Sequence, residues 1–350
     1  MNIVERIYRT LRFQEVDRLP LLEWGPWWNE TLVRWHGEGL SETMADRSEL
    51  RPRDPAVWSN RLWPGGGIID ELGLDPFRVL WISPRHGSCP APSEHGAGLL
   101  HDAADYQALK KYLFPEPAFD QEQLWALAEL HRRGEMALWV YLEGFFWFPR
   151  TLFGIEPHLL AFYDQPELMH RMNADLADYY RRIIVELCSI CVPNLLFFAE
   201  DLSYNHGPML SPEDFHTFLV PYYRQVLPLL ERYGILPLMD SDGDVTAVIP
   251  LAQAAGIRGI GPLERIAGTD LVRIRRDHPD FLLAGGFDKL VMKNGEEAMR
   301  AEFERLLPVM RSGGFVPTAD HQTPPEVSLE QYRLYLRLFR EYATLAARRN

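Results

Sequence analysis

Two aspartates stand two positions apart in Asp240-Ser241-Asp242-Gly243, directly after the short apolar run Leu236–Met239. Carboxylates held this close repel one another, so they share a turn only with a cation, a shared proton or a polar substrate. A solvated turn that caps the following helix is the alternative explanation for the same residues. The distribution of the other acids along the chain favours a functional role.

Apolar runs that end in an acidic residue recur along the chain. They lie at Leu138–Glu143, Leu195–Asp201, Ile257–Glu264, Phe281–Asp288 and Phe315–Asp320. Parallel strands that bring their carboxyl ends to one rim would explain every run. Asp240 and Glu264 are 24 residues apart, as are Glu264 and Asp288, an interval that suits one strand, one helix and two loops.

We therefore expect Asp240, Asp242 and His321 to form one functional cluster, although they are far apart in the sequence. Loops that follow different strands of a barrel converge on the same mouth. Histidine is suited to proton transfer near neutral pH, which makes His321 the candidate for that role. Asp201 ends another strand at the same rim and completes the candidate catalytic set.

Aromatic and polar residues near the predicted strand ends are candidates for substrate binding. A cluster of tryptophans follows the first predicted strand, and such rings can line a pocket for a flat ligand or form a lid over it. The remaining candidates lie on loops at the rim. The full set is Trp24, Trp27, Trp28, Glu143, Phe146, His206, Glu264 and Asp288.

Composition excludes several classes of partner. The net charge of −13 disfavours nucleic acid and anionic membranes as partners. The first residues lack the apolar core of a signal peptide, and no apolar run approaches membrane-spanning length. Only three cysteines occur, so a disulfide framework is not expected and a cytoplasmic location is. Cys188 and Cys191 continue an apolar helix stripe and are interpreted as core residues.

The elements that must position these residues can be predicted from periodicity. Strands are expected at Leu19–Glu23, Ala137–Leu142, Leu195–Ala199 and 236–239, with Ile68–Leu72 and Val79–Ile82 as further candidates. Helices are expected at 2–16 and 121–133, and after caps at Asp164, Ser211 and Ser328. No linker divides the chain. The sequence predicts one α/β domain over residues 1–350, a (β/α)8 TIM barrel. Residues 1–135 would hold an N-terminal helical and hairpin elaboration plus the first strands, and residues 136–350 regular βα repeats.

Four stretches resemble one family. Glu200-Asp201-Leu202 followed by Gly207-Pro208-Met209-Leu210-Ser211-Pro212, then Asp240-Ser241-Asp242-Gly243, Gly285-Gly286-Phe287-Asp288 and Asp17-Arg18-Leu19-Pro20, are similar to motifs of the uroporphyrinogen decarboxylase superfamily. The resemblance runs from about residue 195 to the end and is patchy before residue 130. It implies a barrel that supports two kinds of chemistry.

Uroporphyrinogen decarboxylases work without a cofactor and carry an arginine-rich segment after the first strand, which holds the acidic side chains of the tetrapyrrole. The corresponding stretch here is Glu23-Trp24-Gly25-Pro26-Trp27-Trp28, which contains no arginine. An octa-acid substrate would then face a negative rim, which is electrostatically unfavourable. The decarboxylase activity is therefore the second hypothesis, and a non-catalytic ligand-binding barrel is the third.

The other branch of the superfamily contains methyltransferases that use a corrinoid. Thiol-activating members bind zinc through His-x-Cys and a later Cys; the corresponding positions here are Asp240, Asp242 and the Asp320-His321 region. A zinc-thiolate site with cysteine ligands is therefore not expected. Carboxylates and an imidazole can still bind zinc or another divalent metal, so a metal site at Asp240, Asp242 and His321 is one hypothesis, and a metal-free polar cluster held by hydrogen bonds is the favoured one. We expect a methyltransferase with no covalently bound cofactor that acts on a small methylated substrate. A corrinoid protein is the candidate partner, and a homodimer the candidate assembly.

Overall fold

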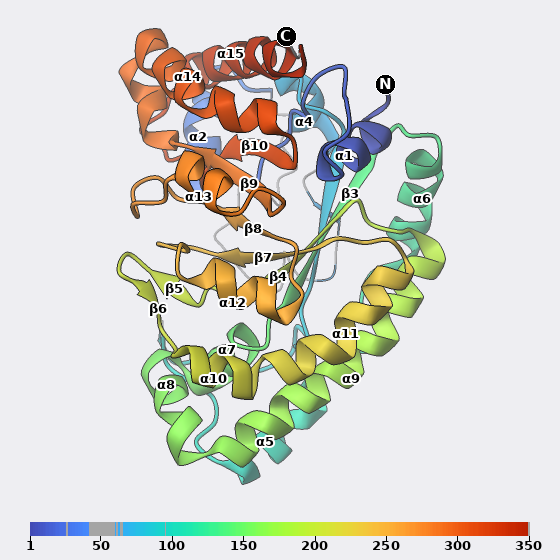
Figure 1. Cartoon of the computed structure of the whole chain (residues 1–350). Coiled ribbons are helices and arrows are strands. Elements are labelled where there is room, and N and C mark those ends of the chain that lie inside the picture. Colours follow the sequence, from blue (N-terminus) through green and yellow to red (C-terminus); the bar gives the residue numbers. More distant parts are fainter. Residues whose placement is uncertain (26, 42–59, 61, 64–65, 95, 349–350) are drawn as a thin grey trace.

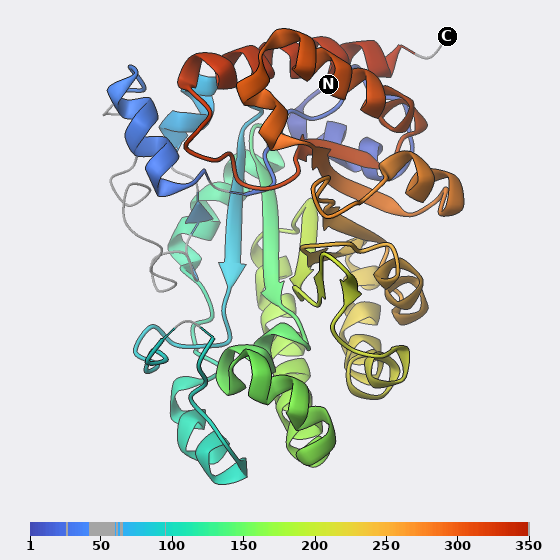
Figure 2. The same ribbon diagram turned by 90° about the vertical axis from the view of Figure 1, so that its left-hand side faces the viewer.

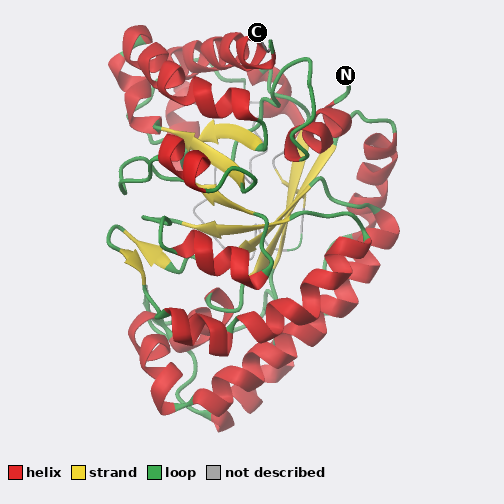
Figure 3. Ribbon diagram, in the orientation of Figure 1, coloured by secondary structure: helices red, strands yellow, loops and turns green. Residues whose placement is uncertain are grey.

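The computed structural model describes residues 1–25, 27–41, 60, 62–63, 66–94 and 96–348. Its main sheet curls around a core of apolar side chains and is covered by helices (Figure 1, Figure 3). The sheet order is β1 (Leu62–Trp63), β2 (Phe77–Ile82), β3 (Ala137–Glu143), β4 (Leu195–Ala199), β7 (Pro237–Ser241), β8 (Gly259–Pro262), β9 (Leu282–Phe287) and β10 (Phe315–Ala319). All neighbouring pairs are parallel except β1 with β2. Figure 2 shows β2 and β3 running the same way.

The sheet is a curled, seven-stranded parallel sheet, and a closed eight-stranded barrel is not confirmed. The first strand predicted at Leu19–Glu23 is wrong, because this segment forms no strand. It contacts Asp75, just before β2, and Ala319, at the end of β10, partly through side chains. The Asp75 carboxylate accepts a hydrogen bond from the Leu21 amide, and the Glu23 carboxylate accepts one from the Ala319 amide. These contacts replace the main-chain ladder that a strand would need.

Helices surround the sheet. In Figure 1, α9 (Pro166–Ile190) and α11 (Val220–Arg232) run side by side, and α14 (Glu296–Ser312) packs against α15 (Leu329–Ala347). The others are α1 (Ile3–Leu11), α2 (Asn29–Gly37), α4 (Gly66–Leu72), α5 (Ala103–Leu109), η1 (Lys110–Tyr112), α6 (Gln121–Arg132), α7 (Trp147–Phe153), α8 (Ile155–Asp164), α10 (Pro212–Phe218), α12 (Val248–Ala255), α13 (Leu271–Asp277) and η2 (Lys289–Asn294). Among the described residues, no helix has the length and apolar character needed to cross a bilayer.

Local signals placed most helix ends. The predicted caps at Ser211 and Ser328 are confirmed, and Ser328 forms a capping box with Gln331. The predicted cap at Asp164 is wrong, because α8 continues through that residue and leaves Gln165 at the start of α9. The strand candidate at Ile68–Leu72 is also wrong, since these residues belong to α4, whereas Val79–Ile82 lies within β2.

The carboxyl ends of the strands carry the acids that the sequence singled out. Glu143 ends β3 and Asp240 lies within β7, while Asp201, Glu264 and Asp320 follow β4, β8 and β10 within two residues. A short hairpin, β5 (Ser203–Tyr204) with β6 (Gly207–Pro208), extends the loop after β4. The fold thus brings loops from distant parts of the chain to one rim.

Candidate functional site

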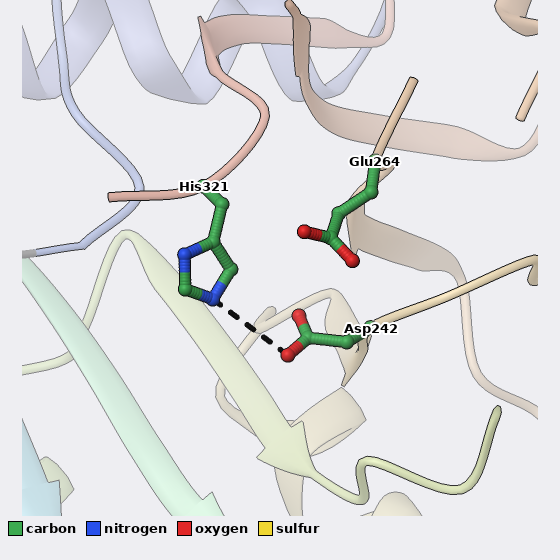
Figure 4. A group of neighbouring side chains, drawn as sticks. All are labelled: Asp242, Glu264 and His321. Carbon is green, nitrogen blue, oxygen red and sulfur yellow. Dashed lines mark ion pairs between the residues drawn. The ribbon is translucent and has the colours of Figure 1, made fainter. Parts of the chain in front are cut away.

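Three side chains converge where β7, β8 and β10 end. Asp242, Glu264 and His321 each offer one ligand atom, and these atoms all lie within 4.8 Å of one another. Figure 4 shows the three side chains pointing toward one another, with His321 Nε2 3.6 Å from Asp242 Oδ2. We call these three residues the rim cluster.

Glu264 is held in the rim cluster by contacts on both carboxylate oxygens. Oε2 accepts a hydrogen bond from the Gly243 amide at 3.2 Å, and Oε1 lies 3.5 Å from Lys289 Nζ. Gly243 has a φ of +83°, and a Cβ at this position would lie 2.6 Å from the main chain of Tyr204. Only glycine suits this turn. The turn positions Asp242, and its Gly243 amide also orients Glu264.

The rim cluster has the donor atoms and spacing of a divalent-metal site. The buried Oδ1 atom of Asp242 has no hydrogen-bond partner among the described residues. Carboxylate oxygen and imidazole nitrogen both bind zinc, with bonds of about 2.0–2.2 Å, so neighbouring ligand atoms lie roughly 3.3–3.6 Å apart. The separation of His321 Nε2 from Asp242 Oδ2 meets this requirement, and the ligand atom of Glu264 lies within 4.8 Å of both residues' ligand atoms.

Asp240 lies deeper than the rim cluster. Its side chain is buried, and its Oδ2 accepts a hydrogen bond from the Trp24 indole at 3.2 Å. Burial, followed by the negative charges of Asp242 and Asp201, raises the pKa of Asp240 well above its usual range. The raised pKa favours the protonated form of the Asp240 carboxyl. The sequence predicted a cluster of Asp240, Asp242 and His321. In the structure Glu264, and not Asp240, lies with Asp242 and His321.

Asp201 approaches the site from the loop after β4. Arg150 Nη1 on α7 donates to both the Asp201 main-chain oxygen and the Asp201 carboxylate, at 2.8 and 2.9 Å. Burial raises the pKa of Asp201 to about 6, with the charge of Asp242 as the next cause, while Arg150 acts in the opposite direction. The residue has a φ of +42°, so the loop is held in an unusual backbone conformation beside the acids.

Two buried carboxylates flank this constellation, and their roles did not emerge from the sequence. Glu200 accepts hydrogen bonds from the amides of residues 145–147 and from Tyr223, and burial raises its pKa to about 7. Glu23 accepts from Tyr332 at 2.7 Å and from Ala319, and burial raises its pKa to about 7. Glu200 thus anchors the start of α7, which carries Arg150.

Comparisons with known proteins decide the family. The sequence signature described as uroporphyrinogen decarboxylase (URO-D) matches residues 103–342. The chain belongs to the uroporphyrinogen decarboxylase family. A search of curated proteins returned no significant match.

Solved structures resemble this family member in fold. A methyltransferase from Methanosarcina mazei superposes with a TM-score of 0.63 at 13% identity, covering 97% of this chain and 98% of that chain. A B12-independent methionine synthase from Shewanella sp. W3-18-1 matches with a TM-score of 0.40 at 13% identity over 64% of each chain. D-Psicose 3-epimerase from Clostridium cellulolyticum H10 matches with a TM-score of 0.45 at 12% identity, over 83% of this chain and 96% of that chain.

The aromatic segment of this family member is divided between site and core. Trp24 reaches the site, where its ring lies 4.8 Å from that of His321. Trp27 is instead buried against Trp35 and Tyr332, which corrects its predicted place in a substrate pocket. Trp28 is 39% exposed. The three tryptophans differ because the chain enters α2 directly after them, so successive side chains point in different directions.

The other predicted substrate-binding residues are divided between the core, the surface and the ends of helices and strands. Phe146 is fully buried, with its ring against those of His158 and Phe162 of α8. The His206 ring is exposed on the β5–β6 hairpin, beside Tyr204. Asp288 caps η2 by accepting a hydrogen bond from the Leu290 amide. Glu143 is buried at the end of β3.

Lys289 and Arg150 are the rim residues that sequence reasoning missed. Lys289 Nζ lies 3.2 Å from Asp320 as well as 3.5 Å from Glu264, and Arg150 holds Asp201. Lys289 directly follows the Gly-Gly-Phe-Asp motif, so its position at a strand end was the one available signal. Both cations are already matched to acids of this protein.

Proposed function

We propose that this protein is a methyltransferase that moves a methyl group between a small methylated substrate and a corrinoid carried by a partner protein. The observation that carries the proposal is the convergence of Asp242, Glu264 and His321 within 4.8 Å beside the Trp24 ring. A methyltransferase with the same fold over nearly its whole length supports it. In this proposal residues 19–23 take the place of the eighth barrel strand.

The charges at the rim argue against a tetrapyrrole octa-acid as substrate. Arg150 is paired with Asp201, Lys289 with Glu264 and Asp320, and Arg85 Nη2 lies 3.8 Å from Glu143. A carboxylate of the substrate would have to displace one of these internal acids. Since each charge-assisted contact is worth about 1.5–3 kcal/mol, the exchange brings no net gain in binding.

A divalent ion, zinc being the candidate, would be held by Asp242, Glu264 and His321. Such an ion would supply Lewis-acid polarisation of the heteroatom that carries the methyl group. Burial raises the pKa of Asp240, so its carboxyl is the group in the site that favours the protonated form. The Trp24 indole orients the Asp240 carboxyl by its hydrogen bond and packs on the imidazole of His321.

The proposed transfer balances in charge and atoms. The methyl carbon loses its bond to the donor heteroatom and gains a bond to the cobalt of cob(I)alamin, which supplies the electron pair. The donor atom keeps the old bonding pair and takes up a proton. A protonated His321 would provide this proton when no ion occupies the rim cluster, and the imidazole that remains is neutral. When Asp242, Glu264 and His321 hold an ion, the Asp240 carboxyl would provide the proton instead and would become a carboxylate.

The test is spectroscopic. The purified protein is mixed with cob(I)alamin and a panel of methyl ethers and methylamines, and formation of methylcob(III)alamin is followed by absorbance. We expect product with the wild type, a large loss in His321→Ala, and normal activity in His278→Ala, whose histidine lies on the loop that leads into the start of β9, at the other end of the strands. Corrinoid binding without product would support a non-catalytic barrel instead.

A further inference from the structure

Three buried polar atoms lie on one face of β3 and make no hydrogen bond of good geometry among the described residues, although the Tyr141 hydroxyl interacts with both the Trp139 indole and Asp240. They are Trp139 Nε1, the Tyr141 hydroxyl and Glu143 Oε2. Residues two apart along a strand point to the same face of a sheet, so the three atoms form a line. Buried polar atoms are satisfied in most native structures, which makes such a line unusual.

This line lies on the concave face of the sheet. The Tyr141 ring stacks on Trp81 of β2 at 5.0 Å and on Phe197 of β4 at 5.4 Å. Its hydroxyl interacts electrostatically with Asp240 on β7, across the intervening strand β4. Side chains from β3 and β7 can meet in this way only inside the curl, so the three polar atoms face the interior beneath the rim cluster.

Glu143 is the charged member of the line and marks its outer end. Only 2% of the residue is exposed. Its Oε1 accepts a hydrogen bond from the Ser83 hydroxyl at 2.8 Å and lies 3.8 Å from Arg85 Nη2. Oε2 has no hydrogen-bond partner in the described part of the chain, and neither has the buried Arg85 Nε. A buried carboxylate oxygen without a donor is costly, so Oε2 is suited to accept a hydrogen bond from a bound ligand.

The charged side chains around Glu143 indicate whether the ligand group that binds there is cationic, neutral or anionic. The three described basic side chains bonded to rim acids, Arg85, Arg150 and Lys289, already face carboxylates of this protein. Within the described ranges, no Lys or Arg side chain is paired with Asp240 or Asp242. The interior beside Glu143 therefore favours a cationic group over a neutral or anionic one.

We propose that Glu143 Oε2 binds the ammonium group of the substrate, so that the substrate is a small amine whose methylated end reaches the rim cluster. Glu143 and Asp240 occupy the same register on β3 and β7, with Ala199 of β4 between them. Two strand spacings correspond to about 10 Å between their backbones, and inward side chains shorten the gap. The inference rests on the proposed function for the identity of the reacting end, and it adds Glu143 as the specificity-determining residue.

Binding of three matched probes tests the proposal without any turnover. They are 3-methoxypropylamine, which is a cation at neutral pH, its neutral isostere 1-methoxybutane, and the anion 3-methoxypropanoate. Dissociation constants are measured by calorimetry on the wild-type protein. We expect the cation to bind about ten- to a hundredfold more tightly than the neutral isostere, and the anion to bind most weakly.

Three variants assign the preference to one residue. Glu143→Gln should abolish the preference for the cation, whereas Ser83→Ala, which leaves the carboxylate intact, should retain it. Glu15→Gln removes an exposed charge far from the site and serves as the control. If Glu143→Gln does not fold, the affinities of the wild type and Ser83→Ala for the three probes still show whether the site prefers a cation.

Equal affinity for the cation and its isostere, tighter binding of the anion, or no binding of any probe would overturn the ammonium site. A retained preference in folded Glu143→Gln would overturn the role of Glu143. Selective binding of the amine with no methyl transfer to cob(I)alamin would leave the ammonium site standing and remove the proposed methyltransferase activity. The two failures are thus distinguishable.

Discussion

At the scale of single residues, the rim cluster depends on what balances the negative charge of Asp242. If a cation is bound, Asp242, Glu264 and His321 would hold it, and the ion would balance the charge of Asp242. With a shared proton, Asp240 carries that proton, because burial and two neighbouring acids raise its pKa. The two arrangements respond in opposite ways to loss of one charge.

Replacing Asp242 by Asn separates these arrangements. If a metal is bound, metal content and melting temperature should fall together, because binding to the native state stabilises it. If only a proton is shared, stability should stay level or rise, since a like-charge repulsion disappears. Elemental analysis and thermal unfolding of the wild type, Asp242→Asn and His321→Ala provide the answer. Asp280→Asn, at an exposed position, is the control. A wild type that contains no metal would eliminate the cation version.

Glu23 should make the stability of the protein depend on pH. Burial raises its pKa from 4.5 to about 7, so the native state binds the proton more tightly than the unfolded state does. The stabilisation is full below pH 4.5 and is lost as pH rises toward 7, by up to about 3 kcal/mol. Glu23→Gln should remove this loss, because the amide can still bond to Ala319 and Tyr332. Urea unfolding at pH 5 and pH 8 measures it; identical pH dependence in both proteins would contradict it.

At the scale of elements, the turn after β7 connects two parts of the site. It presents Asp242, and its Gly243 amide holds Glu264. The hairpin β5–β6 packs over the same turn, since the Asp244 amide donates to the Tyr204 carbonyl at 3.0 Å. Residues of three loops therefore depend on a single glycine.

Gly243→Ala should destabilise the protein and loosen Glu264. The methyl group would lie 2.6 Å from the main chain of Tyr204, and the φ of +83° adds strain, for a total of about 2–4 kcal/mol. Gly268→Ala is the matched control, because Gly268 has a φ of +95° with no atom within 4 Å of the added Cβ. That variant should lose only about 1 kcal/mol, the backbone part. Chemical denaturation of both variants tests this. Equal losses would mean that contact with the hairpin is unimportant.

At the scale of the whole molecule, net charge and rim charge act in the same direction. The chain carries a net charge of −13, and the rim bases that hold Asp201, Glu264 and Asp320 are occupied by these acids. Long-range attraction and local contacts both favour cationic or neutral ligands over polyanions.

Uroporphyrinogen should accordingly not be converted to coproporphyrinogen at an enzymatic rate. Several charge-assisted contacts would be missing for its carboxylates, and each is worth about 1.5–3 kcal/mol of binding. Chromatography of the porphyrins after oxidation, with a heat-inactivated sample as control, measures the conversion. Coproporphyrin above that control would establish decarboxylase activity despite the missing arginines.

The sequence by itself determined where strands end in acids and which serines cap helices, because alternation, apolar runs and capping residues are local signals. Ala137–Glu143 and Leu195–Ala199 are strands as expected, and Asp242 and His321 do meet. These features need no knowledge of the neighbouring strand.

The tertiary structure decided which of these residues share a site. Glu264 joins Asp242 and His321, while Asp240 turns inward to Trp24, because strand register and loop direction set where each side chain points. Phe146 and Trp27 entered the core, since burying a large ring is favourable wherever packing allows it. Contacts between residues far apart in the chain are absent from local patterns, so only the folded sheet reveals the line of polar atoms that ends at Glu143.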